Sequence, residues 1–409
     1  MKILLSAYAC EPHKGSEPGV GWNWMLELIR QGHNVSVITR ENNRAVIERE
    51  IQSLSIPVTI AYHDLPAWCR KWKHLPGGLY FYYLAWQFGA YHRARKLHKM
   101  MTFDLVHHIT FVTFRQPSFM GRLGIPFVFG PVGGGETSPR RLRAGMNLSG
   151  RLRELLRDLL IGAARFDPFM IHTYSKASRI ACTTRDTLQR IPPHFQSKCL
   201  VIPAIGIDPP VLATTSAPPP APRFLFIGRL LYWKGLHLTL RAMPEVLRTV
   251  PDARLTVIGE GSDARWLKQV AESCGIQAHV TWVSSLPHNE ISAAFRDHTA
   301  LVFPSLHDSG GMVVLESLAA QVPVICLALG GPAVFVDSSC GIRIDAANQT
   351  EEVIQHALAT AMIQLAQNPS LRQQLAANCL SRAHNFTWSG AVEHLYSSLR
   401  DATFQTVNS

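Results

Sequence analysis

Two cations five positions apart are the first residues in this chain whose types could do chemistry together. Arg229 and Lys234 follow the apolar run Phe224–Ile227. A guanidinium offers a two-pronged fork and an ammonium a point charge, and together they suit a diphosphate. Taken alone, the pair is equally well read as two solvated surface charges.

A second group of candidate residues follows the apolar run Leu301–Phe303. Asp308 stands just before the expected start of a helix, and Glu316 would lie one to two turns into that helix. Open N–H groups at a helix start can bind phosphate oxygens, and a carboxylate there can accept two ribose hydroxyls. Taken singly, Asp308 would be a helix cap and Glu316 an acid that the helix dipole favours. The expected helix start consists of Gly310, Gly311, Met312 and Val313.

Two glycine-rich segments could also approach a ligand. The segment 15–21, which holds Gly19 and Gly21, is expected to form a loop before a helix that starts near Val20. Such a loop either lets backbone N–H groups reach a ligand or forms a tight turn. Gly259 opens a G-x-G-x-x-A match to the dinucleotide fingerprint, which keeps a NAD-dependent oxidoreductase as an alternative. The acid expected at the end of the following strand to hold the ribose is missing, because that position reads Val283-Ser284.

The elements that must position these residues alternate between short apolar runs and amphipathic runs. This alternation predicts an α/β fold of two doubly wound parallel sheets. Helices are expected at Val20–Gln31, Leu236–Thr249 and Asp263–Cys274. Strands are expected at 3–9, 35–39, 58–61, 105–109, 127–129, 180–183 and 200–202, and then at 224–227, 255–258, 280–283, 301–303 and 324–327.

The proline-rich stretch between the two halves predicts the domain boundary. Ile202–Pro210 and Ser216–Pro222 are rich in proline, which cannot supply hydrogen bonds to a sheet and favours a linker. We therefore expect an N-terminal Rossmann-like domain at 1–205 and a C-terminal Rossmann-like domain at 206–385. Residues 386–409 are expected to form a helix that crosses back to the first domain.

Composition bounds the class of protein. Of 409 residues, 47% are hydrophobic and 17% charged, which excludes a disordered chain, a coiled coil and a collagen. Lys plus Arg exceeds Asp plus Glu by 40 − 29 = 11, which favours an anionic partner. No nucleic-acid-binding motif accompanies this charge, so no nucleic-acid partner is expected. No apolar run reaches the ~18 residues of a membrane-spanning helix.

Taken together, these motifs resemble the nucleotide-sugar-dependent glycosyltransferases of family 4, which are group 1 glycosyltransferases with the GT-B fold. The resemblance rests on Arg229 and Lys234 before a glycine, on I-G-x-G at 258–261, and on P-S-x2-acid-x7-E from Pro304 to Glu316. Residues 202–208 are similar to the family's linker, and 130–136 to a segment of some bacterial members. The resemblance covers nearly the whole chain and implies two Rossmann-like domains that face a cleft.

The resemblance also implies a role for each residue. Arg229 and Lys234 would neutralise the donor diphosphate and Glu316 would bind the ribose. Asp308 stands where the family usually has a Glu that contacts the sugar, and is one methylene shorter. His107 or His108 would contact the sugar, and a core histidine is the alternative for either. Backbone of the donor site would come from Gly19, Gly21, Gly259, Gly310, Gly311, Met312 and Val313.

The activity that the resemblance implies is transfer of a hexose from a nucleotide-diphosphate sugar to a glycan or lipid-linked acceptor. Retention of configuration, no metal and no other cofactor are expected, in the synthesis of cell-surface polysaccharide or glycolipid. Because Asp308 replaces Glu, a non-catalytic nucleotide- or glycan-binding protein is the alternative.

Two basic stretches indicate where the acceptor could be met. Residues 66–101 mix aromatic and cationic side chains, and arginines at 140–157 surround leucines at 152–160. Basic amphipathic segments of this kind can lie on an anionic membrane surface, and ordinary helices with a solvated basic face are the alternative. We expect a cytoplasmic protein that lies on the inner face of the plasma membrane.

Overall fold

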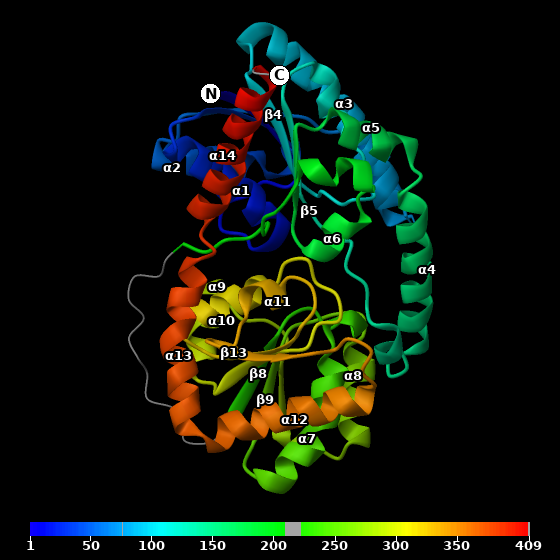
Figure 1. Cartoon of the computed structure of the whole chain (residues 1–409), viewed down its shortest axis with the longest axis vertical. Coiled ribbons are helices and arrows are strands. Elements are labelled where there is room, and N and C mark those ends of the chain that lie inside the picture. The colour runs from blue at the N-terminus through cyan, green and yellow to red at the C-terminus, as the bar shows by residue number, and fades with distance from the viewer. Residues whose placement is uncertain (76, 209–221, 408–409) are drawn as a thin grey trace. The chain divides into compact units, whose positions relative to one another are not determined.

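The computed structural model describes residues 1–75, 77–208 and 222–407 (Figure 1). It divides into two compact units. Unit 1 comprises Met1–Gly135, Ile161–Ile205 and the C-terminal residues from Trp388, and unit 2 comprises Glu136–Leu160 and Gly206–Thr387. The division expected from the sequence, 1–205 against 206–385, differs in one segment, because residues 136–160 pack within unit 2. Most of the proline-rich segment 216–222, read as a linker, lies outside the described residues.

Unit 1 is built on a seven-stranded sheet in the order β3-β2-β1-β4-β5-β6-β7, with every neighbouring pair parallel. Its strands β4 and β5 are buried along their whole length, as expected for a parallel sheet covered on both faces. The strands are β1 (Lys2–Ala7), β2 (Asn34–Thr39), β3 (Val58–Tyr62), β4 (Leu105–Thr110), β5 (Phe127–Val132), β6 (Arg179–Cys182) and β7 (Cys199–Val201).

Helices cover this sheet, and α3 contributes three large aromatic side chains to the core. Tyr82, Tyr83 and Trp86 of α3 join Phe127 and Phe129 of β5 in one core cluster. The helix α14 packs on α1 within the same unit. The helices are α1 (Ser16–Arg30), α2 (Arg44–Leu54), α3 (Gly78–Met101), α5 (Pro168–Lys176), α6 (Arg185–Arg190) and α14 (Trp388–Val407), and α4 (Leu148–Ala164) begins in unit 2 and ends in unit 1.

Unit 2 is built on a six-stranded parallel sheet in the order β10-β9-β8-β11-β12-β13. All twelve strands expected from the sequence are present in the two sheets, and β13 is an additional one. The strands are β8 (Arg223–Ile227), β9 (Arg254–Ile258), β10 (Val280–Val283), β11 (Ala300–Phe303), β12 (Val324–Leu327) and β13 (Gly341–Ile344). The helices are α7 (Leu236–Thr249), α8 (Ala264–Ser273), α9 (His288–Arg296), α10 (Met312–Ala319), α11 (Pro332–Phe335), α12 (Glu351–Gln367) and α13 (Pro369–His384).

The strand order of unit 2 fixes where a ligand site can form. From β8 the chain builds outward through β9 and β10 on one side, then returns to place β11 on the other side. The carboxyl ends of β8, β9 and β11 therefore meet at one edge of the sheet, where the order reverses. Crevices at this kind of switch point are the usual ligand sites of open α/β sheets.

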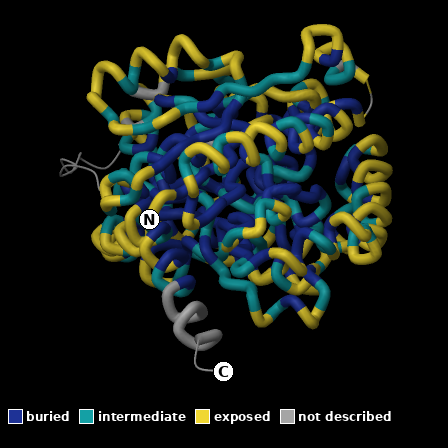
Figure 2. Tube along the Cα trace, turned by 90° about the horizontal axis from the view of Figure 1, so that it is seen from above, coloured by how far each residue is buried: buried dark blue, intermediate teal, exposed yellow. Residues whose placement is uncertain are grey.

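Burial follows the same layering in both units. Buried residues trace the strands and the inner faces of helices, whereas exposed residues lie on the outer helical turns and loops (Figure 2). Among the residues that the structure describes, no helix combines the length and the apolar character needed to cross a membrane.

Candidate functional site

Glycines bring the loops after β8 and β9 into contact. A Cβ atom on Gly259 would lie 2.0 Å from the carbonyl oxygen of Gly228, and one on Gly261 would lie 2.2 Å from that of Leu230. Gly259 also has a φ of +144°, which side chains rarely adopt. The two glycines of the fingerprint are therefore explained by the close packing of these loops, without a bound dinucleotide.

The loop after β8 is fastened to the loop after β11. The amide of Leu306 donates to the carbonyl of Trp233 at 2.8 Å. Gly235 has a φ of +73°, and a Cβ there would lie 1.9 Å from the carbonyl oxygen of Pro304. The two loops can lie this close only because residue 235 has no side chain.

Lys234 and Asp308 meet where these two loops join. The Lys234 ammonium forms an ion pair with the Asp308 carboxylate. The other carboxylate oxygen of Asp308 accepts a hydrogen bond from the amide of Gly310 at 3.2 Å. Asp308 is therefore not the cap of α10, whose N-cap is Gly311 with a φ of +97°. The first-turn amides of Met312 and Val313 have no acceptor within the helix, as in any α-helix.

Arg229 and Glu316 belong to the same edge of the sheet. Arg229 is exposed two residues beyond the end of β8. Glu316 is the fifth residue of α10, the helix that follows β11, and its side chain is half-buried. The structure thus joins Lys234 to Asp308 directly and places Arg229 and Glu316 on the flanking elements.

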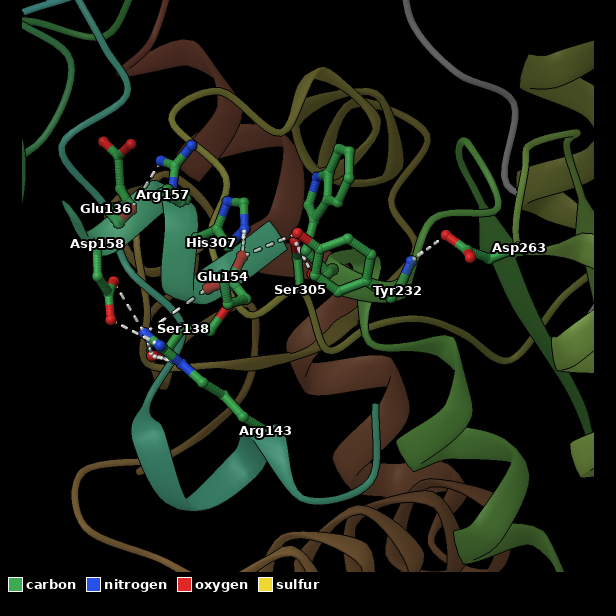
Figure 3. A network of polar contacts seen from close by, with 11 residues as sticks. Glu136, Ser138, Arg143, Glu154, Arg157, Asp158, Tyr232, Asp263, Ser305 and His307 are labelled. Atoms are coloured by element: carbon green, nitrogen blue, oxygen red, sulfur yellow. Dashed lines mark hydrogen bonds and ion pairs between the residues drawn. The ribbon is translucent and has the colours of Figure 1, made fainter. Parts of the chain in front are cut away.

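A buried carboxylate that was not predicted from the sequence contacts the loops of Lys234 and Asp308. Glu154 of α4 is 0% exposed. Its Oε1 accepts hydrogen bonds from Nε2 of His307 at 2.9 Å and from the hydroxyl of Tyr232 at 3.1 Å (Figure 3). Arg143 lies 3.7 Å from its other oxygen. Burial alone would raise the pKa of Glu154, but the hydrogen bond and charge of His307 lower it to about 2.

The segment 136–160 makes two further contacts with the loops of unit 2. Glu136 accepts a hydrogen bond from the Ser309 hydroxyl at 2.5 Å. Asp263, at the start of α8, accepts from the Asn147 amide at 2.7 Å and from the backbone of Tyr232 at 3.0 Å. None of these residues was given a role of its own from the sequence, because each is an ordinary polar residue whose partner is distant in sequence.

The two candidate histidines are both buried within unit 1, on opposite faces of β4. His107 donates from Nε2 to the carbonyl of Gly130 at 2.7 Å and accepts at Nδ1 from the Tyr396 hydroxyl at 2.9 Å. His108 lies 2.8 Å from the Tyr83 hydroxyl. Burial lowers the pKa of His107 to about 4 and that of His108 to about 3, so both rings are neutral at pH 7.

The segment 15–21 corrects an expectation, because it is not a loop before a helix. The helix α1 begins at Ser16, so Gly19 and Gly21 lie in its first turns. A Cβ on Gly19 would lie 2.1 Å from the carbonyl oxygen of Lys14, and one on Gly21 would lie 2.2 Å from that of Ala9. These glycines let the helix start pack against the chain that precedes it.

The sequence of the chain is similar to a known protein family and to known proteins. Residues 213–381 match the model of the family described as "Glycosyl transferases group 1". The chain is 30% identical over 189 residues to a D-inositol 3-phosphate glycosyltransferase of Corynebacterium diphtheriae. That match covers 44% of this chain and 43% of the relative, so the aligned stretch spans less than half of either protein.

Two solved structures extend the likeness to the whole chain at the level of fold. The lipopolysaccharide outer core galactosyltransferase WaaB superposes with a TM-score of 0.64 at 13% identity, over 99% of this chain and all of the other. The Anabaena protein HepE, in complex with UDP and glucose, superposes with a TM-score of 0.60 at 14% identity, over 98% and 99% of the two chains. The chain therefore has the GT-B fold, and its residues 213–381 are similar to the group 1 glycosyltransferases.

Proposed function

We propose that this protein is a retaining glycosyltransferase that moves a hexose from a nucleotide-diphosphate sugar to a glycan or lipid-linked acceptor, without a metal or other cofactor. The observation that carries the proposal is the Lys234–Asp308 ion pair beside the first turn of α10. It places a cation, a carboxylate and helix N–H groups at the edge of the sheet where α/β folds bind ligands. The match of this unit to the group 1 glycosyltransferases supports the same function.

The charges at this edge fit the chemistry of the leaving group. Breaking the bond between the anomeric carbon and the diphosphate leaves negative charge on the departing oxygen. Preorganised cations and amides that face such a charge contribute roughly 10²–10³ in rate each. Lys234, Arg229 and the start of α10 would supply this stabilisation, which is why we propose a reaction that needs no metal.

The carboxylates would hold the rest of the donor. Asp308 lies beside the ammonium that faces the diphosphate, so it is placed to accept hydrogen bonds from hydroxyls of the sugar. Glu316, one turn into α10, would accept from the ribose. The bound UDP and glucose of the HepE structure support a uridine donor as the first to be tested.

A melting-temperature panel with UDP, GDP, ADP and NAD tests nucleotide binding. A ligand at ~100 times its dissociation constant adds roughly 2.7 kcal/mol of stability. We expect UDP or GDP to raise the melting temperature of the wild type and to have a much smaller effect on Lys234→Ala. A response to NAD alone would favour an oxidoreductase, and no response to any nucleotide would overturn the proposal.

Transfer itself is tested with the nucleotide sugar that the panel selects. We expect hydrolysis or transfer to continue in the presence of EDTA, and the first-formed product to keep the anomeric configuration of the donor in NMR spectra. An inverted product would overturn retention, and complete loss of activity in EDTA would overturn metal independence. Nucleotide binding without hydrolysis or transfer to any acceptor would favour a non-catalytic binding protein.

We further propose that unit 1 lies on the anionic inner face of the plasma membrane to meet a lipid-linked acceptor of cell-surface polysaccharide or glycolipid synthesis. One face of α3 supports this, because Phe81, Leu84 and Phe88 are exposed at helical spacing. Arg95 and Lys99 continue the same face toward the end of the helix. Exposed aromatic and cationic side chains on one helical face suit the interface of an anionic bilayer.

The part of α4 that belongs to unit 2 carries a separate exposed apolar face, which we propose as a second membrane contact. Leu148, Leu152, Leu155 and Leu159 follow one another at spacings of four, three and four, and each is more than half exposed. Flotation with vesicles that contain anionic lipid tests both faces. We expect binding to anionic but not to neutral vesicles, with loss in Phe81→Glu and Leu152→Glu. Equal binding to both kinds of vesicle, or to neither, would overturn the membrane proposal.

A further inference from the structure

The segment 136–160 touches each of the three loops that form the candidate site. Tyr232 in the loop after β8 and His307 in the loop after β11 both donate to Glu154. Asp263, in the loop after β9, is bound by Asn147. This segment is separated in the chain from the rest of unit 2 by residues 161–205, which belong to unit 1, yet it packs as part of unit 2.

The orientation of α4 singles out Glu154 within this segment. Among residues 148–160, all of which the structure describes, only Gly150 and Glu154 are buried, one helical turn apart. A Cβ on Gly150 would lie 2.8 Å from the ring of Tyr232, so the missing side chain lets the helix lie against that ring. The helix therefore turns its carboxylate inward and leaves its leucines outside, the reverse of the usual arrangement.

The two groups that Glu154 holds lie next to the residues of the site. Tyr232 is two positions before Lys234, and His307 immediately precedes Asp308. The rings of Trp233 and His307 stack at 5.6 Å with an angle of 14°. A single buried oxygen thus holds both loops together (Figure 3). The two residues that it binds lie within two positions of the Lys234–Asp308 ion pair in the chain.

We propose that Glu154 is a positioning residue that sets the separation of Lys234 and Asp308 by holding Tyr232 and His307 on one carboxylate oxygen. This inference rests on the proposed function, because it assigns Glu154 to the donor site. Burial raises the pKa of the Tyr232 hydroxyl, and the charge of Glu154 raises it further, so this group remains a hydrogen-bond donor. Since a carboxylate only accepts, the His307 Nε2 also donates, and both contacts persist at neutral pH.

The experiment combines hydrogen exchange with UDP binding and turnover in the full chain. The variants are Glu154→Ala, Glu154→Gln and Tyr232→Phe, and Glu272→Gln, an exposed acid of α8, is the matched control. An unpaired buried donor weakens a site by roughly tenfold. We expect Glu154→Ala to weaken UDP binding and lower kcat by about that factor or more, and Glu154→Gln, which keeps an acceptor oxygen, to recover part of the loss.

Hydrogen exchange separates this role from general stability. We expect faster exchange in peptides that cover 229–235 and 304–311 in Glu154→Ala and Tyr232→Phe, with β12 and β13 unchanged. Unchanged exchange in these loops would overturn the positioning role whatever the nucleotide result. Faster exchange with unchanged UDP affinity and kcat would overturn it as well. A wild type that binds none of UDP, GDP and ADP would overturn the proposed function instead, and the exchange result would then still decide whether Glu154 orders the two loops.

Discussion

The ammonium of Lys234 and the carboxylate of Asp308 are paired across two loops that are 74 positions apart in the chain. Each charge compensates the other in a partly buried place, where an isolated charge would be costly. A donor that binds here would place its diphosphate against the ammonium and its sugar against the carboxylate. Removal of either partner would leave the other without compensation.

Lys234→Ala should lower kcat by roughly 10²–10³-fold, because under the proposed function it removes a cation that would face the leaving diphosphate. Steady-state kinetics with the nucleotide sugar that stabilises the wild type would measure this. Lys268→Ala, which removes an exposed cation of α8, is the control and should leave kcat unchanged. Equal kinetics for the two variants would mean that Lys234 does not face the donor.

Glu316→Gln should weaken nucleotide binding. The substitution replaces one of the two carboxylate oxygens that would accept hydrogen bonds from the ribose hydroxyls with an NH2 group. The loss of a hydrogen bond to a charged group is about 1.5–3 kcal/mol, or roughly tenfold or more in dissociation constant. Calorimetry with UDP and with 2′-deoxy-UDP would locate the contact. The wild type should discriminate between the two ligands and the variant should not. Undiminished discrimination in Glu316→Gln would place the ribose elsewhere.

Gly235→Ala should destabilise unit 2 far more than Gly275→Ala does. Both glycines have positive φ, +73° and +68°, so both substitutions cost about 1 kcal/mol of backbone strain. Only at residue 235 would the new Cβ also collide with a carbonyl oxygen, at 1.9 Å, whereas a Cβ at residue 275 meets no described atom within 4 Å. Urea unfolding monitored by circular dichroism would compare the two. Similar losses would show that the β8 and β11 loops separate at little cost.

Acidification should weaken unit 1 through His107. Because burial lowers its folded pKa to about 4, the unfolded chain binds a proton at higher pH than the folded chain does. Stability should therefore fall as the pH drops from the ordinary histidine pKa of about 6.5 toward about 4. His107→Gln should show a shallower decline over this window in chemical denaturation. An imidazole that titrates near 6.5 in NMR spectra of the folded protein would contradict the prediction.

The sequence was most informative about the strands and about the start of one helix. The apolar runs predicted all twelve strands because strands buried on both faces are mostly apolar. The strand β13 was missed because Gly341 and Arg343 break its apolar pattern. The helix Leu236–Thr249 was placed correctly, since Gly235 marks its start.

The site was only partly predictable for a physical reason. Lys234 was named because two cations after a strand suit a diphosphate, and Asp308 because it precedes a helix start in a motif of the family, and the structure joins the two. Glu154 could not be found, because the exposed leucines around it indicate a helix packed by its apolar face. Whether such a helix turns its leucines or its acid inward depends on His307 and Tyr232, which lie far along the chain.

The position of residues 136–160 has a consequence for how the protein is made. During synthesis these residues leave the ribosome well before the sheet of unit 2, so the Glu154 carboxylate lacks its partners Tyr232 and His307 until the later loops emerge. Unit 2, which contains the group 1 match, is not continuous in sequence. A single fragment that begins at residue 206 would therefore lack residues 136–160, which contact the loops of the candidate site. A truncation that starts at the linker would release a fragment with Tyr232 and His307 left open to water.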